Sequence, residues 1–206
     1  MDVSSLSPDC TLRLLLLRHG RPNADAAGRC HGQFDVELSD EGREQIRKKS
    51  EILSGLRADA LYSSPSKRAF ESALILGQSM QVQPRVIPEL QEINFGEFEG
   101  RSYEEIRQSQ PMEYELWMTH PTRVAFPGGE SFAAFRKRVL RFLAKLMKAH
   151  ERKIVVVCSH SGVNRVILAH VLGLASQNIF RIDQAYAALN IVDFVRCCPI
   201  VRLING

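Results

Sequence analysis

Two histidines each follow an apolar run of the chain closely. His19 stands beside Arg18 directly after the run 12–17, and His160 comes two residues after the run 154–158. Short, mostly apolar runs are typical of buried strands, and the ligand sites of open α/β sheets gather at the carboxyl ends of strands. Two histidines at the ends of parallel strands would face one pocket.

An arginine and a group of acids accompany these histidines. Arg68 follows the segment 63–65, whose proline indicates a helix start and so places Arg68 in or near the first helical turn. A cation is unfavourable there with respect to the helix dipole, and a bound anion would relieve the conflict. Several acids lie in the segment 89–99, and by composition alone any of them could be solvated surface.

Together these residue types suit phosphoryl transfer. The guanidinium groups of Arg18 and Arg68 match phosphate oxygens two at a time. Histidine is a nucleophile near neutral pH, and a covalent intermediate divides one hard displacement into two easier ones. A carboxylic acid would protonate the departing alkoxide. The sequence contains no Walker motif, dinucleotide glycine fingerprint or cluster with metal-ligand spacing, so we expect neither a metal nor a cofactor.

Strand-like and helix-like segments alternate along the chain. The expected strands cover 12–17, 60–63, 82–87, 154–158 and about 187–195, with a closing hairpin strand at 200–204. The expected helices cover 40–56, 66–80, 130–149 and 163–172. Such alternation predicts an α/β fold with three layers, a mainly parallel central sheet carrying helices on both faces.

Size and composition favour one globular domain. The chain has 206 residues, of which 45% are hydrophobic and 24% charged, and we expect a single domain over 1–206 with a small helical insert at about 101–126. The net charge of +4 comes from scattered basic residues, which gives no case for nucleic acid. The N-terminus lacks the pattern of a signal peptide, and no apolar run approaches the roughly 20 residues of a membrane span.

The cysteines indicate a reducing compartment. They are five in number, show no CxxC spacing, and include Cys158 in an expected core strand. This usage is typical of reduced thiols rather than a disulfide framework or a zinc site, and a catalytic cysteine is the less favoured alternative. We therefore expect a cytoplasmic protein acting on a small-molecule phosphate ester, with no nucleic acid or membrane partner. A homodimer stays open.

Several motifs, taken in order, make the chain similar to the histidine phosphatase superfamily, which includes the cofactor-dependent phosphoglycerate mutases. The similarity extends from Leu14 to about Phe194 and implies a phosphoglycerate mutase-like fold. The matching segments are 18–20, 38–42, 63–65 with Arg68, 89–100, 127–131 and 159–162.

The resemblance implies a role for each matching residue. His19 would be the nucleophile that becomes phosphohistidine, Glu92 the proton donor, and His160 a second catalytic histidine lining the phosphate pocket. The surrounding cations should keep His19 neutral and therefore nucleophilic. The implied substrate-binding residues are Arg18, Arg68 and Ser161, with backbone amides after His160 helping to hold the phosphate oxygens.

The segment after the nucleophile departs from the family pattern. The family often has threonine three residues and asparagine six residues after the nucleophile, where this chain has Pro22 and Asp25. An aspartate would repel a phosphate, so we expect Asp25 to point away from the pocket or lie outside it. We assign no role to the nearby Asn23.

Three functions are compatible with the resemblance. A phosphomonoesterase is favoured over a phosphoglycerate mutase, because a mutase needs extra cations for the substrate carboxylate and a site closed to water. The position of the mutases' additional lysine looks like Tyr103 here, and 104–126 lacks a paired-arginine segment. A non-catalytic phosphate-binding module is disfavoured because every implied catalytic residue is present.

The substrate is indicated by one local pattern. The Gly-x-Cys-x-Gly-x-x-Asp run at 28–35 resembles that of α-ribazole-5′-phosphate phosphatases, which makes α-ribazole 5′-phosphate the most specific candidate; alternatively, this loop only packs against the domain. The insert carries four large side chains that would either cover a flat leaving group or fill the interface between insert and sheet. These are Tyr103, Tyr114, Trp117 and Met118.

Overall fold

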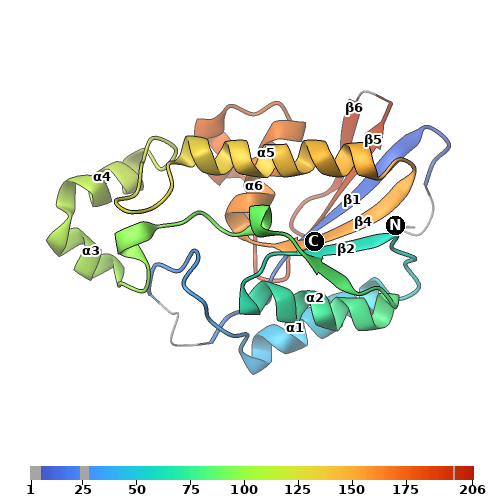
Figure 1. Ribbon diagram of the computed structural model, residues 1–206, viewed down its shortest axis with the longest axis horizontal. Coiled ribbons are helices and arrows are strands. Elements are labelled where there is room, and N and C mark those ends of the chain that lie inside the picture. Colours follow the sequence, from blue (N-terminus) through green and yellow to red (C-terminus); the bar gives the residue numbers. More distant parts are fainter. Residues whose placement is uncertain (1–5, 24–27, 197) are drawn as a thin grey trace.

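A central sheet organises the computed structural model, which describes residues 6–23, 28–196 and 198–206. Within these ranges the sheet has six strands in the order β3-β2-β4-β1-β5-β6 (Figure 1). The pairs β3–β2, β2–β4 and β4–β1 are parallel, whereas β5 runs antiparallel to both β1 and β6. The expected mainly parallel sheet is confirmed. The strands are β1 (Cys10–Arg18), β2 (Ala60–Ser63), β3 (Pro84–Val86), β4 (Lys153–Ser159), β5 (Leu189–Val195) and β6 (Cys198–Leu203).

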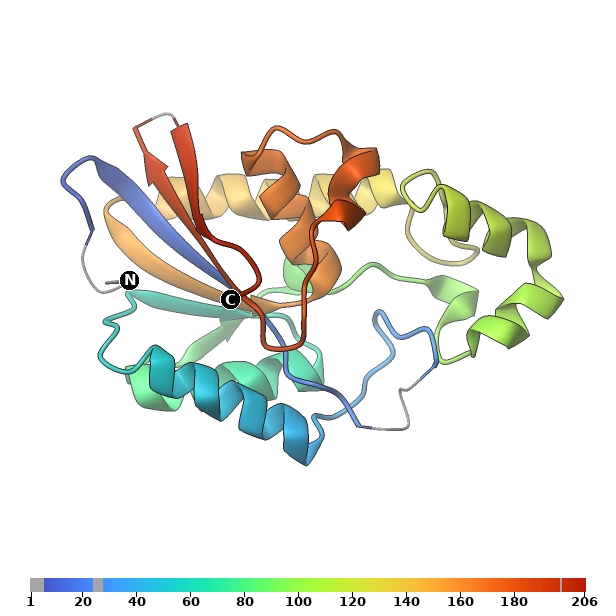
Figure 2. The same cartoon turned by 180° about the vertical axis from the view of Figure 1, so that it is seen from behind.

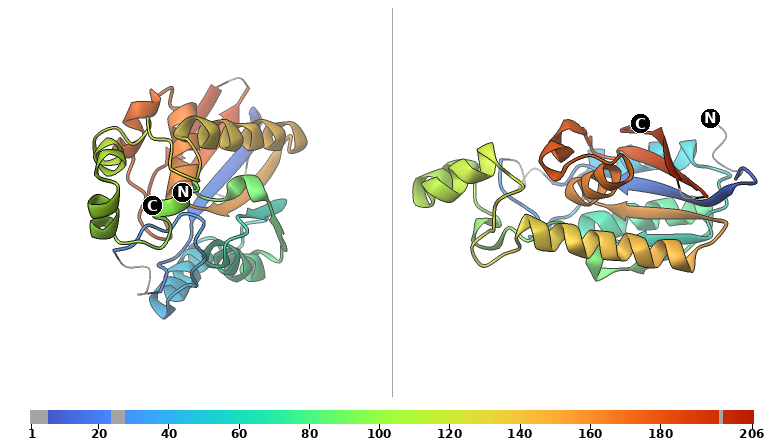
Figure 3. Two further views of the ribbon diagram at one scale, coloured as in Figure 1. Left: turned by 60° about the vertical axis from the view of Figure 1, so that its left-hand side comes forward. Right: turned by 90° about the horizontal axis from the view of Figure 1, so that it is seen from above.

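Helices cover both faces of the sheet, as the alternation of segments predicts. Helices α1 (Asp40–Ile52) and α2 (Lys67–Met80) lie on one face, and α5 (Phe132–Ala149) and α6 (Ser161–Val171) lie on the other (Figure 3). The fold is therefore a three-layer α/β arrangement.

The two faces of β1 explain the unbroken apolar run of its sequence. Successive side chains of a strand point to opposite faces. Leu14 and Leu16 belong to the core beneath α5, together with Phe135, whereas Leu15 and Leu17 belong to the core on the α1 and α2 side. A strand covered on both faces needs apolar residues at every position, which is why β1 shows no alternation.

Several element ends differ from the sequence prediction for local reasons. Helix α1 ends at Ile52, short of the expected residue 56, because the chain turns at Gly55, which has a φ of 85°. Helix α5 begins at Phe132 instead of residue 130, since the Ser131 hydroxyl accepts a hydrogen bond from the Ala134 amide and caps the helix there.

Two short α-helices lie in the segment between α2 and α5, where the sequence predicts an insert at about 101–126. They are α3 (Tyr103–Ser109) and α4 (Pro111–Thr119), which extend from one end of the molecule (Figure 2). A reciprocal capping box between Ser102 and Glu105 fixes the start of α3. None of the helices within the described ranges combines the length and the hydropathy that a bilayer crossing requires.

Candidate active site

The two strand-end histidines meet at the carboxyl edge of the sheet. Strands β1 and β4 are parallel neighbours, and their register pairs Arg18 with Ser159. The residue that follows each strand is a histidine, so His19 and His160 lie side by side with ring centroids 5.2 Å apart. The sheet register thus brings together two residues that are far apart in the sequence.

The ring of His19 is buried and held in one orientation. His19 is only 3% exposed to solvent, and its Nδ1 atom lies 2.7 Å from the carbonyl oxygen of Gly20. A carbonyl oxygen can only accept a hydrogen bond, so Nδ1 carries the proton and Nε2 keeps its lone pair. The Nε–H of Arg68 donates to this Nε2 atom at 3.2 Å.

His19 is neutral near pH 7. Burial lowers the pKa of its imidazole well below the ordinary value, and the positive charges of Arg68 and Arg18 lower it further. Burial therefore contributes more to the lowered pKa than the surrounding cations, which are the cause expected from the sequence.

Arg68 is the centre of the cluster. It is the second residue of α2, as the sequence predicts, and only 1% exposed. Its Nη2 donates to the carbonyl oxygen of Gly32 at 2.6 Å, and its Nη1 to that of Phe34 at 3.2 Å. Nη2 also lies 3.4 Å from Nδ1 of His160. The guanidinium therefore faces both histidines while two carbonyl groups fix its outer edge.

His160 is held from the opposite side by hydroxyl groups. Its Nε2 lies 2.8 Å from Oγ of Ser64 and 3.2 Å from Oγ of Ser66. Since Nδ1 faces the Arg68 guanidinium, which only donates, Nε2 carries the proton. Burial lowers the pKa of His160 well below its usual range, and Arg68 and His19 add to the effect.

Arg18 lies under an aromatic ring at the edge of this cluster. Its Nη1 donates to the carbonyl oxygen of Gln184 at 2.6 Å, and its Cζ lies 4.0 Å from the ring centroid of Tyr186. The Nε of Arg18 is buried without a hydrogen-bond partner among the described residues. Arg18 thus keeps donor capacity that the protein itself does not use.

Glu92 approaches the start of α6. One carboxylate oxygen accepts hydrogen bonds from the Gly162 amide at 2.9 Å and the Ser161 hydroxyl at 3.4 Å, while the other accepts from the Ile93 amide at 3.0 Å. A Cβ atom at Gly162 would lie 2.2 Å from Oε1 of Glu92, so only glycine permits this approach. The Gly162 amide, one of the backbone amides after His160, is thus engaged with Glu92.

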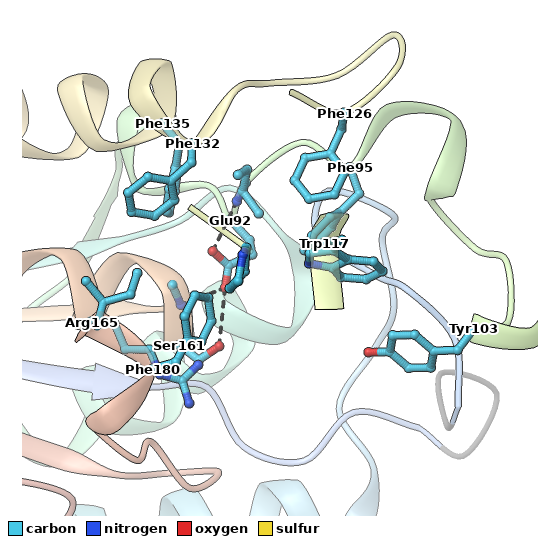
Figure 4. Close-up of a pocket in the computed structure, with 14 residues that line it drawn as sticks. Glu92, Phe95, Tyr103, Trp117, Phe126, Phe132, Phe135, Ser161, Arg165 and Phe180 are labelled. Atoms are coloured by element: carbon cyan, nitrogen blue, oxygen red, sulfur yellow. Dashed lines mark hydrogen bonds between the residues drawn. The ribbon is translucent and has the colours of Figure 1, made fainter. Parts of the chain in front are cut away.

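An aromatic cavity of about 240 Å³ adjoins Glu92. Trp117 from α4 and Tyr103 from α3 form part of its wall, with ring centroids 5.6 Å apart (Figure 4). The ring of Trp117 also packs against those of Phe95 and Phe126, at centroid distances of 5.3 Å and 5.5 Å. Trp117 therefore both fills the interface between the insert and the rest of the domain and lines the cavity. Met118, in contrast, is 46% exposed and is not among the lining residues.

Some residues of the site carry no clear signal in the sequence. These residues are Ser66, Arg165 and Tyr186, whose neighbours in the site become visible only in the fold. The Nε of Arg165 donates to the carbonyl oxygen of Ile182 at 2.8 Å, and its side chain lines the aromatic cavity. The serine-rich segment 63–65 is a recognisable motif, yet its contact with His160 is not predictable from spacing.

Asn23 is exposed and its backbone amide donates to the carbonyl oxygen of Glu37 at 3.0 Å. Asp25 lies outside the described residues. In the ranges that the structure describes, no group of three or more histidine, cysteine, aspartate or glutamate side chains is arranged to hold a metal ion.

Comparison with known proteins identifies the family. The pattern of the histidine phosphatase superfamily (branch 1) matches residues 14–206. The adenosylcobalamin/α-ribazole phosphatase of Escherichia coli is 31% identical over 197 residues, which are 95% of this chain and 96% of that protein. Phosphoserine phosphatase 1 of Hydrogenobacter thermophilus is 32% identical over 163 residues, which are 79% of this chain and 77% of the relative.

A solved structure shares the fold over the same extent. The α-ribazole phosphatase from Shigella flexneri superposes with a TM-score of 0.86 at 29% sequence identity, covering 94% of this chain and 96% of that one. The family pattern, the sequence relatives and the shared fold agree, and the chain belongs to the histidine phosphatase superfamily as one of its phosphatases.

Proposed function

We propose that the chain hydrolyses a phosphomonoester through a phosphohistidine on His19, with Glu92 as general acid and base. The observation that carries this proposal is the state of His19. It is buried, its Nδ1 proton is fixed on the Gly20 carbonyl, and its Nε2 lone pair faces the Arg68 guanidinium. A neutral imidazole with one unprotonated nitrogen beside a phosphate-binding group is the arrangement that nucleophilic attack on phosphorus needs.

In the first step, the Nε2 lone pair of His19 attacks the phosphorus atom. The N–P bond forms as the ester P–O bond breaks, and the departing alkoxide takes the proton of the Glu92 carboxylic acid. The guanidinium groups of Arg18 and Arg68 hold the phosphoryl oxygens, whose charge they offset. The Nε–H of Arg68 moves its hydrogen bond from His19 to a phosphoryl oxygen, which frees the lone pair.

In the second step, a water molecule attacks the phosphohistidine. The Glu92 carboxylate accepts a proton from this water, the N–P bond breaks, and its electron pair returns to Nε2 of His19. Inorganic phosphate leaves with the water oxygen, and Glu92 is again protonated. Atoms and charges balance with water as the second substrate.

We assign α-ribazole 5′-phosphate as the substrate. The proposal is supported by the two relatives named for this activity and by the aromatic cavity beside Glu92, where the leaving group of the first step would lie. Aromatic walls suit a flat, apolar base. Phosphoserine is the second candidate, since a relative of similar identity is named for it and Arg165 in the cavity wall offers a cation for a carboxylate.

Turnover of a small panel of phosphate esters tests this assignment. We expect kcat/KM for α-ribazole 5′-phosphate to exceed that for phosphoserine, fructose 2,6-bisphosphate and 3-phosphoglycerate. A preference for phosphoserine would move the substrate to the second candidate. Conversion of 3-phosphoglycerate to 2-phosphoglycerate without release of phosphate would indicate a mutase, and absence of turnover on every ester would indicate a non-catalytic binding module.

We further propose a cytoplasmic location and a small-molecule substrate. The thiols of Cys10, Cys30 and Cys158 are free and buried, which supports a cytoplasmic location where thiols stay reduced. A small-molecule ester, rather than nucleic acid, is supported by the limited volume of the cavity beside Glu92.

A further inference from the structure

The carboxylate of Glu99 has an unusual set of partners. It accepts hydrogen bonds from three successive backbone amides, those of Gly32, Gln33 and Phe34, each at 2.9 Å. It also accepts one from the amide of Phe95 at 3.0 Å. The three loop amides fasten the loop 32–34 to the segment that carries Glu99 and, seven residues earlier, Glu92, while the Phe95 amide holds the Glu99 side chain on its own segment.

The same loop holds the phosphate-binding arginine from its other side. The carbonyl oxygens of Gly32 and Phe34 accept the Nη2–H and Nη1–H of Arg68 at 2.6 Å and 3.2 Å. One residue further on, a carboxylate oxygen of Asp35 accepts the amide of Lys67 at 2.8 Å, at the start of α2. The loop therefore connects Glu99 to Arg68 through two residues whose amides face one partner and whose carbonyls face the other.

The close contact of the loop with its neighbours leaves it little freedom. A Cβ atom at Gly32 would lie 2.1 Å from the carbonyl oxygen of Ile93 and 2.8 Å from a carboxylate oxygen of Glu99. Only glycine fits between these two segments. A shift of the loop would therefore have to break the hydrogen bonds of Glu99, and it would carry the two carbonyls away from Arg68.

We propose that Glu99 is a positioning residue for Arg68 and acts through the backbone of the loop 32–34. By fixing the two carbonyls, it orients the guanidinium so that the Nε–H points at Nε2 of His19, the atom that the proposed mechanism uses. The proposal rests on that mechanism only for its effect on turnover, because the orientation of Arg68 can be measured in the resting protein.

The role requires a carboxylate. An ionised carboxylate has two acceptor oxygens and no donor, so it can satisfy four amides at once. A glutamine at this position offers one acceptor oxygen and an NH₂ group that would face N–H donors. The substitution Glu99→Gln thus keeps the size of the side chain and removes the function that we assign to it.

The first test is independent of catalysis. In Glu99→Gln, we expect the dissociation constant for inorganic phosphate, measured by calorimetry, to rise about tenfold or more, and the ¹⁵Nε–H resonance of Arg68 to shift or broaden. Glu97→Gln is the matched control, because Glu97 lies on the same segment but is exposed, and among the described residues its carboxylate accepts a hydrogen bond only from the Gln110 side chain. The proposal would be overturned if Glu99→Gln left both the phosphate affinity and the Arg68 resonance unchanged.

The second test separates a positioning role from a general loss of structure. In a background of Arg68→Gln, adding Glu99→Gln should weaken phosphate binding by less than about twofold, because the partner through which Glu99 acts is gone. Equal losses in both backgrounds would overturn the proposal. If Glu99→Gln does not fold by circular dichroism, Glu99→Asp, whose shorter carboxylate reaches fewer amides, is measured by the same two readouts and judged by the same outcomes. Since phosphate binding requires no turnover, failure of the proposed catalytic mechanism would not be mistaken for failure of this one.

Discussion

The two halves of the site are built in different ways. The phosphate end consists of buried polar side chains such as His19, Arg68 and His160, each held by hydrogen bonds to backbone carbonyls or to serine hydroxyls. The leaving-group end consists of aromatic rings such as Trp117 and Tyr103, which come from the insert and are held by packing. Hydrogen bonds fix direction, whereas packing fixes mainly volume, so the first half suits chemistry and the second suits recognition.

This contrast predicts which substitutions affect every substrate and which affect only some. Changes at the phosphate end should reduce turnover of all esters. Changes at the aromatic end should reduce turnover only of esters whose leaving group fills the cavity.

The largest expected effect follows from removing the nucleophile. His19→Gln should reduce kcat by about 10³-fold or more on every ester, because the covalent route is lost while the fold is kept. Steady-state rates on nitrophenyl phosphate and on α-ribazole 5′-phosphate measure it, with thermal unfolding as the check on folding. Turnover close to that of the wild type on either ester would remove His19 from the mechanism.

Removing the proton donor should discriminate between leaving groups. Glu92→Gln should slow an alkyl phosphate by about 10²- to 10⁴-fold, but nitrophenyl phosphate far less, because nitrophenolate leaves without a proton. Glu89→Gln is the matched control, since Glu89 lies in the same segment and pairs with Lys145 at 3.2 Å. Equal slowing of both esters by Glu92→Gln, or a leaving-group effect in Glu89→Gln, would assign the proton transfer to another group.

The aromatic half is tested by truncating its central ring. Trp117→Ala should lower kcat/KM for α-ribazole 5′-phosphate by about tenfold and leave that for ethyl phosphate nearly unchanged. Met112→Ala serves as control, because Met112 lies on the same helix and is 79% exposed. A uniform loss on both esters would mean that the ring supports the fold rather than the substrate.

The smallest effect concerns stability and pH. In the folded state the pKa of His160 is lowered by burial, so the folded protein binds fewer protons than the unfolded chain. The stability due to the neutral ring is fully present above pH 6.5, the ordinary histidine value, and is lost as the pH falls below it. Between pH 7.5 and 5.5, the free energy of unfolding by urea should fall by about 1.4 kcal/mol more in the wild type than in His160→Gln. The same pH dependence in both proteins would contradict a buried neutral His160.

Part of the site was predictable because it depends on sheet order. His19 and His160 each follow an apolar run, and parallel neighbouring strands necessarily bring their ends together. The position of Arg68 in the first turn of α2 follows from the preceding proline. These predictions combine local sequence signals with one rule of sheet topology, and neither depends on contacts between distant side chains.

The acids between 89 and 99 show what the sequence leaves undecided. Glu89 forms an ion pair with Lys145, Glu92 is buried against Gly162, and Glu99 binds four backbone amides. The three side chains are chemically identical, and only packing of distant segments gives them different tasks. The role of Tyr186 is likewise undecided by the sequence. Its ring stacks on Arg18 because the following strand β5 pairs with β1, the strand that ends at Arg18.

The most direct test of the account is the chemical identity of the covalent intermediate. Because Nδ1 of His19 is committed to the Gly20 carbonyl at 2.7 Å, phosphate should be carried by Nε2. A single turnover quenched in alkaline denaturant, analysed by ³¹P NMR and peptide mass spectrometry, should show one phosphohistidine at His19, substituted on Nε2. Phosphate on Nδ1, phosphate on another residue, or a completed turnover in which no phosphoenzyme forms at any time would contradict the account.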